Sequence, residues 1–145
     1  WDRMMNTNLR GLFFCCQLVG KEMIKQQKGK IINVSSVISQ LVQSGRSVYA
    51  ISKAGVSHLT RALAMEWSKY NISVNAISPG LTITSINCEH FAEHPDELEE
   101  FVKVIPRGRV GSPSDYAGAA VFLASDASDY VCGQTLLIDG GMALP

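Results

Sequence analysis

The stretch SVYAISK, residues 47–53, places a tyrosine and a lysine four residues apart at the start of a long run without proline. The run continues to about Tyr70 and is rich in Ala, Leu, Met and Lys, which favours a helix. Residues four apart on a helix lie one above the other, so the Tyr49 phenol and the Lys53 ammonium share one face. The same spacing also arises by chance on solvated helices, so its meaning depends on the surrounding residues.

The chemistry of this pair suits proton transfer. A free phenol has a pKa of about 10 and is a poor acid or base at neutral pH. A lysine cation held beside it favours the phenolate and lowers that pKa. Of the four tyrosines, only Tyr49 has a lysine four residues later. The pair therefore predicts proton exchange with an alcohol or a ketone.

The composition is typical of one compact domain. The chain has 145 residues, of which 46% are hydrophobic and 18% are charged, which excludes disorder and leaves room for a core. Its 13 Lys and Arg balance its 13 Asp and Glu, and no basic stripe appears, so we expect no nucleic-acid partner. No apolar run approaches the roughly 20 residues of a membrane span, so we expect no membrane partner either.

The N-terminus and the cysteines indicate a reducing compartment. Residues 1–6, WDRMMN, lack the apolar segment and the cleavage site of a signal peptide. The four cysteines show no C-x-x-C spacing and are typical of free buried thiols, so we expect a cytoplasmic protein. They are Cys15, Cys16, Cys88 and Cys132.

Helical and strand patterns alternate along the chain. Helices are predicted at residues 2–27 (stopped by Gly29), from Ser47 to about Tyr70, at 95–104, and from a Ser112 N-cap to about Ser125. Strands are predicted at residues 30–36, 72–77 and 135–138. The β-branched 30–36 run suits a strand buried on both faces. The stretch with Asn87, His90 and His94 is polar, and no helix or strand is assigned to it. This alternation predicts an α/β fold with a parallel sheet of three strands, helices on both faces and at least one free edge.

Candidate site residues gather where the strands end. Ser36 ends the first strand, thirteen residues before Tyr49, and Pro79-Gly80 breaks the second. In open parallel sheets, ligands bind beyond the carboxyl ends of the strands. Asn8 stands in mid-helix, where asparagine is a weak choice unless it has another task.

These residues together resemble the classical short-chain dehydrogenase/reductase family. Order and spacing agree over essentially the whole chain. The matching pieces are Asn8 in NLRG, Ser36 in IINVSS, the Tyr49–Lys53 pair, residues 75–80 (NAISPG) with Thr84, residues 122–125 (FLAS), and Gly133-Gln134 followed by residues 138–141 (IDGG).

The resemblance implies a catalytic role for four residues. Tyr49 would be the general acid/base, and Lys53 would lower its pKa and hold the nicotinamide ribose. Ser36 would donate a hydrogen bond to the substrate oxygen. Asn8 would hold a water that links Lys53 to solvent. The reaction implied is the interconversion of a secondary alcohol and a ketone, on substrates such as sugars, polyols, sugar acids or 3-oxoacyl carriers.

The resemblance also implies a cofactor and an assembly. NAD or NADP would be bound by Tyr49 and Lys53 together with the segment that follows Pro79 and Gly80, where the Thr82 backbone and the Thr84 hydroxyl would fix the nicotinamide carboxamide. Nothing in the sequence chooses between the two cofactors. A homo-oligomer, a tetramer or a dimer, is expected, with the Asn8 and Tyr49 helices packed against their symmetry mates. The residues expected to supply that surface are Ala50, Ala54, Val56, Leu63 and Trp67.

The family's glycine-rich turn, G-x-x-x-G-x-G, is not found in this sequence. Residues 1–145 are therefore expected to form a single partial domain, the C-terminal catalytic half of a doubly wound Rossmann-type fold whose first half is absent. On this interpretation the chain alone neither binds a dinucleotide tightly nor turns over.

Other interpretations stay open. An epimerase or dehydratase of the family's extended branch would share the Tyr–Lys pair, and a truncated chain without turnover would share every motif. His90 and His94 with Cys88 could be metal ligands, but no fourth ligand has matching spacing, so no metal site is predicted. Ser35, beside Ser36, is expected to be structural. The acidic residues Asp96, Glu97, Glu99 and Glu100 are expected to form a solvated helix face.

Overall fold

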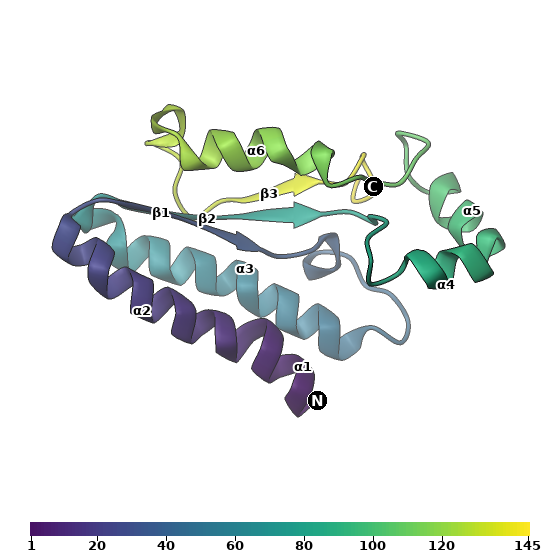
Figure 1. Cartoon of the computed structure of the whole chain (residues 1–145), viewed down its shortest axis with the longest axis horizontal. Helices are drawn as coiled ribbons and strands as arrows, with labels where there is room; N and C mark the ends of the chain where they lie inside the picture. Colours follow the sequence, from purple (N-terminus) through teal and green to yellow (C-terminus); the bar gives the residue numbers. More distant parts are fainter.

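The computed structural model describes residues 1–145 and shows a three-stranded parallel sheet in the order β1-β2-β3. The strands are β1 (Gly29–Val34), β2 (Ile72–Pro79) and β3 (Thr135–Ile138). Figure 1 shows α2 (Gly11–Gln26) and α3 (Ser47–Trp67) below the sheet and α6 (Ser114–Ala124) above it. The predicted α/β class and the parallel sheet are confirmed. None of the helices is long and apolar enough to span a membrane.

Burial differs sharply between the first two strands. Every residue of β2 from Ile72 to Ser78 is buried, whereas most of β1 is only half-buried and Val34 is 52% exposed. The prediction that β1 is buried on both faces is therefore wrong. β1 lies at an edge of the sheet and pairs with β2 alone, because neighbours, and not β-branched composition, decide how much of a strand is covered.

The first helix contains a π-helical turn that the sequence did not predict. α1 (Asp2–Met5) continues through the π turn η1 (Asn6–Arg10) into α2, and the Gly11 N–H reaches back to the Asn6 carbonyl. α2 ends at Gln26, so the predicted stop at Gly29 is wrong. Gln27 takes the left-handed conformation with φ 54°, and its side-chain amide donates to the Ile24 carbonyl at 2.8 Å. That bond satisfies a carbonyl at the helix end without a glycine.

The core lies between α2, α3 and the sheet. Cys16 of α2, Leu63 and Ala64 of α3, and Ile72 and Val74 of β2 form one buried cluster. Each such side chain contributes roughly 1.5–3 kcal/mol of burial free energy when it is the size of Val, Ile or Leu.

Two of the predicted interface residues belong to the core. Leu63 is in the buried cluster, and Val56 is fully buried. Neither can contact a second copy, so this part of the assembly prediction is wrong. The helical period alone identified an apolar face, but it did not show how much of that face the sheet covers.

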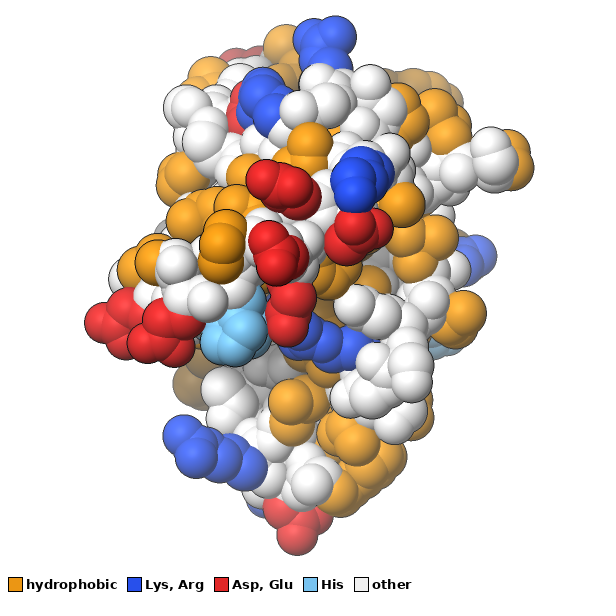
Figure 2. Space-filling view, turned by 90° about the vertical axis from the view of Figure 1, so that its right-hand side faces the viewer, with side chains coloured by type: hydrophobic (Ala, Val, Ile, Leu, Met, Phe, Trp, Pro, Cys, Tyr) orange, Lys and Arg blue, Asp and Glu red, His pale blue; other side chains and the backbone are white.

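The remaining helices are less deeply packed. α4 (Cys88–Glu93) forms where no regular structure was predicted, and α5 (Pro95–Lys103) forms almost as predicted. Phe91 is the only buried residue of the two helices and meets Phe101 edge to face, with ring centroids 6.1 Å apart. Figure 2 shows acidic side chains gathered at this end of the molecule, where Asp96, Glu97 and Glu99 among others are exposed.

Helix α6 begins one residue later than predicted, at Ser114, with Pro113 in place of Ser112 as its N-cap. The Asp115 carboxylate accepts a hydrogen bond from the Ser112 backbone N–H at 2.8 Å, which is one half of the predicted capping box. The Ser112 hydroxyl does not supply the other half, because it donates to the same carboxylate at 3.1 Å.

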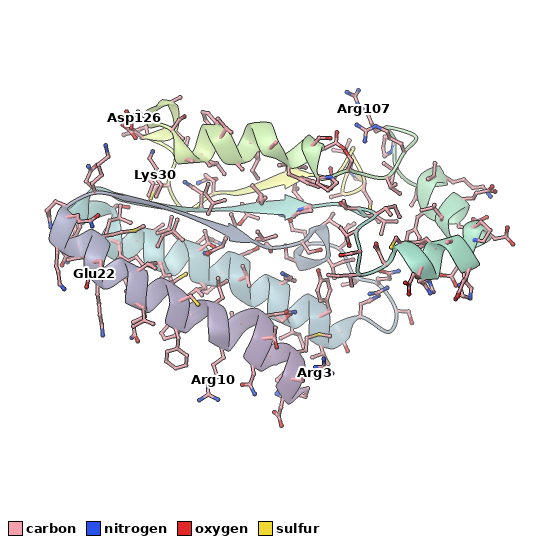
Figure 3. All side chains as sticks on the ribbon, in the orientation of Figure 1. Arg3, Arg10, Glu22, Lys30, Arg107 and Asp126 are labelled. Atoms are coloured by element: carbon pink, nitrogen blue, oxygen red, sulfur yellow. The ribbon has the colours of Figure 1, made fainter.

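The turn after α6 is tied back to the edge strand. Lys30 of β1 donates to the Asp129 carboxylate at 2.7 Å and to the Ser128 hydroxyl at 3.2 Å. Figure 3 shows Lys30 pointing from β1 towards this turn, which also carries Asp126. The contact joins residues almost a hundred positions apart and holds α6 against the start of the sheet.

Candidate functional site

The carboxyl ends of β1 and β2 lie side by side. The Ser35 N–H, one residue past β1, donates to the Ile77 carbonyl of β2 at 2.8 Å. Ser36 and Gly80 therefore both follow their strands at the same edge of the sheet, as the sequence predicted. Gly80 is needed there because a Cβ at this position would lie 2.7 Å from the Asp139 Cα after β3.

Ser36 presents a hydroxyl whose proton is free. The residue is buried and extended, and it precedes a short 3-10 turn, Val37–Ser39. Its oxygen accepts from the Ile38 N–H at 3.3 Å. Ser36 makes no other side-chain hydrogen bond in the chain, so its O–H can donate to a ligand.

Tyr49 and Lys53 stand one turn apart near the start of α3, as predicted. The Lys53 Nζ lies 5.8 Å from the centre of the Tyr49 ring. Tyr49 is half-buried, and its hydroxyl makes no hydrogen bond within the chain. The Lys53 Nζ donates to the Val34 carbonyl at the end of β1, at 3.0 Å. Burial lowers the pKa of the Lys53 ammonium from its ordinary value.

Buried hydroxyls tie the N-terminal half of α3 to the end of β1. The Ser35 hydroxyl donates to the Lys53 carbonyl at 3.0 Å and lies 2.7 Å from the Ser57 hydroxyl. Within β1 itself, the Asn33 amide donates to the Thr60 hydroxyl at 2.9 Å. These bonds fix how far α3 projects beyond the strand, and they agree with the structural role expected for Ser35.

Asn8 is directed at α3 by the π turn that contains it. Its amide donates to the Ser52 hydroxyl at 3.1 Å, and Ser52 in turn donates to the Tyr49 carbonyl at 2.7 Å. Asn8 therefore supports the turn of α3 that carries Tyr49. The expected water beside Asn8 stays a prediction.

Ser52 is a site residue that the sequence reasoning missed. It is fully buried and lies between the two catalytic candidates. The available signal was a small polar residue three positions after Tyr49, on the face of the helix that turns towards the sheet.

The segment after Gly80 crosses to the start of α6. Thr82 forms a parallel bridge with Gly111, and its hydroxyl contacts the Tyr116 hydroxyl. The Thr82 backbone N–H has no partner within the chain and can donate to a ligand. The Thr84 hydroxyl accepts from the Ile86 N–H at 3.3 Å. Tyr116 was not predicted, because only the fold brings α6 to this strand end.

Two cavities open elsewhere on the molecule. One of about 180 Å³ lies at the ends of β2 and β3 and is lined by Gly80, Arg107 and Tyr116 among others. Figure 3 shows Arg107 pointing outward from the loop between α5 and α6. The other, of about 490 Å³, lies between α3 and the start of β3. Neither is lined by Ser36, Tyr49 or Lys53, so neither cavity marks the catalytic candidates.

His90 of α4 contacts both His94, which follows α4, and a carboxylate of α5. The His90 and His94 rings stack with centroids 4.6 Å apart, and the His90 Nε2 lies 3.0 Å from the Glu97 carboxylate. No cluster of three or more His, Cys, Asp or Glu side chains could hold a metal ion.

Residues 1–143 match the family described as Enoyl-(Acyl carrier protein) reductase. The chain belongs to the short-chain dehydrogenase/reductase family. It is 48% identical to the 2-dehydro-3-deoxy-D-gluconate 5-dehydrogenase of Dickeya dadantii, over 97% of this chain and 56% of that protein. It is 42% identical to the NAD-dependent glycerol dehydrogenase of Listeria innocua, over 99% of this chain and 56% of that protein.

A solved short-chain dehydrogenase/reductase structure has the same fold. The gluconate 5-dehydrogenase of Burkholderia cenocepacia, in complex with NADP and tartrate, superposes with a TM-score of 0.96 at 39% identity, over 100% of this chain and 56% of that one. The chain therefore spans little more than half the length of these family members.

Proposed function

We propose that this chain is the catalytic half of an NAD(P)-dependent oxidoreductase that interconverts a secondary alcohol and a ketone. The observation that carries the proposal is the Tyr49–Lys53 pair, held one turn apart at the carboxyl end of β1, the strand that Ser36 follows. Both the Tyr49 and the Ser36 hydroxyls have a proton that no protein acceptor takes. Membership of a family of dehydrogenases and reductases supports the same reaction.

In this mechanism the chain moves a proton and holds the substrate oxygen. The nicotinamide, when bound, supplies or accepts the hydride. During reduction the Tyr49 hydroxyl gives its proton to the substrate oxygen, and during oxidation the phenolate takes it back. The Ser36 hydroxyl donates to the same oxygen and stabilises the charge that develops there. The Lys53 cation favours the phenolate.

The donors at this strand edge fit the nicotinamide end of a dinucleotide. Lys53 would hold the ribose hydroxyls, and the Thr82 N–H and Thr84 hydroxyl, following Pro79 and Gly80, would hold the carboxamide. The glycerol dehydrogenase relative is named as NAD-dependent, and the Burkholderia structure contains NADP. We therefore propose NAD or NADP as the cofactor.

The substrate is proposed to be a small polyhydroxylated alcohol or its ketone. The relatives include enzymes named for a keto sugar acid, for glycerol and for gluconate. A suitable panel for the enzyme that contains this chain is therefore a keto sugar acid, dihydroxyacetone and a 3-oxoacyl thioester, each with NADH and with NADPH. Oxidation of the cofactor on one of the first two supports the proposal. Turnover of a sugar nucleotide without net oxidation would instead support an epimerase or dehydratase.

We also propose that residues 1–145 are a partial domain that needs a dinucleotide-binding half. The free edge of β1 leaves strand backbone unpaired, and no glycine turn is present to bind a pyrophosphate. Calorimetric titration of this chain alone with NADH and NADPH should show no tight binding. A dissociation constant in the low micromolar range, with turnover that requires Tyr49, would show that this half is self-sufficient.

The outer faces of α2 and α3 support a homo-oligomer, a dimer or a tetramer. Phe13, Phe14 and Leu18 of α2 and Ile51 of α3 are all more than 40% exposed, and apolar surface of this kind marks contact sites. Light scattering of the enzyme at micromolar concentration tests this, and a monomer would contradict it. The four free thiols support a cytoplasmic location, which cell fractionation would test.

A further inference from the structure

One side chain holds both ends of residues 82–84. The Asn87 Oδ1 accepts from the Thr84 backbone N–H at 2.8 Å, and the Asn87 Nδ2 donates to the Thr82 carbonyl at 2.9 Å. We propose that Asn87 is a positioning residue of the cofactor site, which acts by fixing the segment that meets the nicotinamide carboxamide. This inference rests on the proposed function, since that function assigns residues 82–84 to the carboxamide.

Helix capping explains only one of the two bonds. The bond from the Thr84 N–H matches one half of a capping box, because the Thr84 carbonyl accepts from the Cys88 N–H at 2.9 Å, but the bond to the Thr82 carbonyl has no capping role. Asn87 immediately precedes α4, and an asparagine at that position ordinarily accepts from a backbone N–H in the first turn of its helix. Here the Asn87 side chain makes no bond to the first turn of α4. Its amide turns back along the chain, away from the helix it precedes and onto residues 82–84.

The amide can satisfy both partners in only one orientation. A flip would place the Nδ2 donor against the Thr84 N–H and the Oδ1 acceptor against the Thr82 carbonyl, so both bonds would become repulsive. The two bonds therefore fix the Asn87 side chain, and the fixed side chain sets the distance between Thr82 and Thr84.

The Thr82 end has other anchors, whereas the Thr84 N–H has none. Thr82 pairs with Gly111 and contacts Tyr116, so it stays in place if Asn87 is removed. The only partner of the Thr84 N–H is Asn87. Loss of the amide therefore removes the acceptor of the Thr84 N–H and of the Thr84 hydroxyl, which donates to the Asn87 Oδ1 at 3.4 Å and is the side-chain group assigned to the carboxamide. The Thr84 carbonyl keeps its bonds from the Asn87 and Cys88 N–H groups, so the loss frees the N–H and the hydroxyl of Thr84 and not the whole residue.

The test compares two alanine variants in the enzyme that joins this chain to its dinucleotide-binding half. Asn87→Ala should lower kcat about 10- to 100-fold, the scale of a small misplacement of a reacting group. Ser85→Ala is the matched control: Ser85 is exposed and its side chain makes no hydrogen bond. The kcat of Ser85→Ala should stay within twofold of the value for the parent enzyme.

Carboxamide recognition separates positioning from a general structural role. The readout is the ratio of kcat/KM for the natural cofactor to kcat/KM for its 3-acetylpyridine analogue, in which an acetyl group replaces the carboxamide. Asn87→Ala should move this ratio towards one, and Thr84→Val should do the same. In the double variant Asn87→Ala/Thr84→Val, the change in this ratio should be smaller than the two single changes combined, because both substitutions act through Thr84.

Asn87→Asp gives a second route if the alanine variant does not fold. The aspartate keeps an acceptor for the Thr84 N–H and loses the donor to the Thr82 carbonyl, so its ratio should fall between those of the parent enzyme and Thr84→Val. If the Asn87 variants have the same ratio as Ser85→Ala while Thr84→Val changes it, the role of Asn87 is overturned and the proposed carboxamide site stands. An unchanged ratio in Thr84→Val would overturn the proposed carboxamide site and the Asn87 inference with it.

Discussion

The β2–α3 frame and the α4–α5 segment (residues 88–103) are built on different principles. β2 is buried from Ile72 to Ser78, and five residues of α3 are buried. The α4–α5 segment buries only Phe91. Its polar contacts are exposed, such as the His90–Glu97 pair. The frame is thus held by packing and buried hydrogen bonds, and the segment by a few interactions at the surface.

This difference indicates which region can hold a catalytic group and which region can vary in sequence. The proposed proton-transfer group stands on the frame, where packing determines its geometry. A weakly packed surface segment tolerates changes of sequence with little cost to the fold, and it can open locally at low free energy. Substitutions on the frame should therefore affect catalysis or stability strongly, and matched substitutions on the segment should not.

Replacing Tyr49 with Phe should produce the largest effect. The change removes one oxygen that has no protein partner, so the frame should keep its stability. Turnover of the enzyme should fall on the order of 10²–10⁴-fold, the range for a general acid/base. Steady-state kinetics measures the loss, and thermal unfolding serves as the control. Activity within a few-fold of the parent would remove Tyr49 from this role.

Replacing Lys53 with Met should shift the pH dependence of alcohol oxidation. Because burial lowers the pKa of Lys53, its cation supports the phenolate below that pKa and ceases to do so above it. The parent enzyme should gain activity with rising pH through an apparent pKa well below ~10, and Lys53→Met should move this inflection up by about 1–3 units. Cofactor binding should weaken too. If the inflection of the pH profile stays in place in Lys53→Met, and an isotope effect shows that hydride transfer is rate-limiting, then Lys53 does not favour the Tyr49 phenolate.

The same substitution in the two regions tests the comparison directly. Val74 of β2 is 0% exposed, and Val104, just after α5, is 60% exposed. Val74→Ala should cost about 1–3 kcal/mol of unfolding free energy, because it leaves a cavity in a packed core. Val104→Ala should stay within about 0.5 kcal/mol of the parent. Denaturant unfolding gives both values, and equal losses would show that the two regions are packed alike.

The smallest effect on stability is expected for the ion pair that joins the loop after α5 to the first turn of α6. The Arg109 guanidinium binds the Asp115 carboxylate through two bonds of 2.8 Å and holds its pKa well below the ordinary value, with help from the Ser112 N–H. A depressed folded-state pKa stabilises the protein above the unfolded pKa of about 3.9 and ceases to do so as the pH falls towards the folded value.

Asp115→Asn should therefore lower the unfolding temperature by a few degrees at pH 7. This gap in unfolding temperature between the variant and the parent should narrow below about pH 4. Thermal unfolding at both pH values measures it. A gap of the same size in acid would mean that packing, and not charge, explains the loss.

The sequence by itself determined the order of the elements and the positions of the candidate site residues along them. The Tyr49–Lys53 spacing needed only the helical period, and Ser36 and Gly80 needed only the positions where two strands end. Such patterns are local, because they depend on backbone geometry over a few residues. Local patterns also placed β2 and β3 to within two residues.

Only the tertiary structure decided what those residues touch. Asn8 meets Ser52 across 44 positions of sequence, through a π turn that no local pattern marked. Val56 and Leu63 are core rather than contact surface because the sheet covers that face of α3, and β1 is half-exposed because one strand flanks it instead of two. Thr82 meets Tyr116 across 34 positions for the same reason: a polar group takes the partner that folding brings within reach, and a linear pattern does not contain that information.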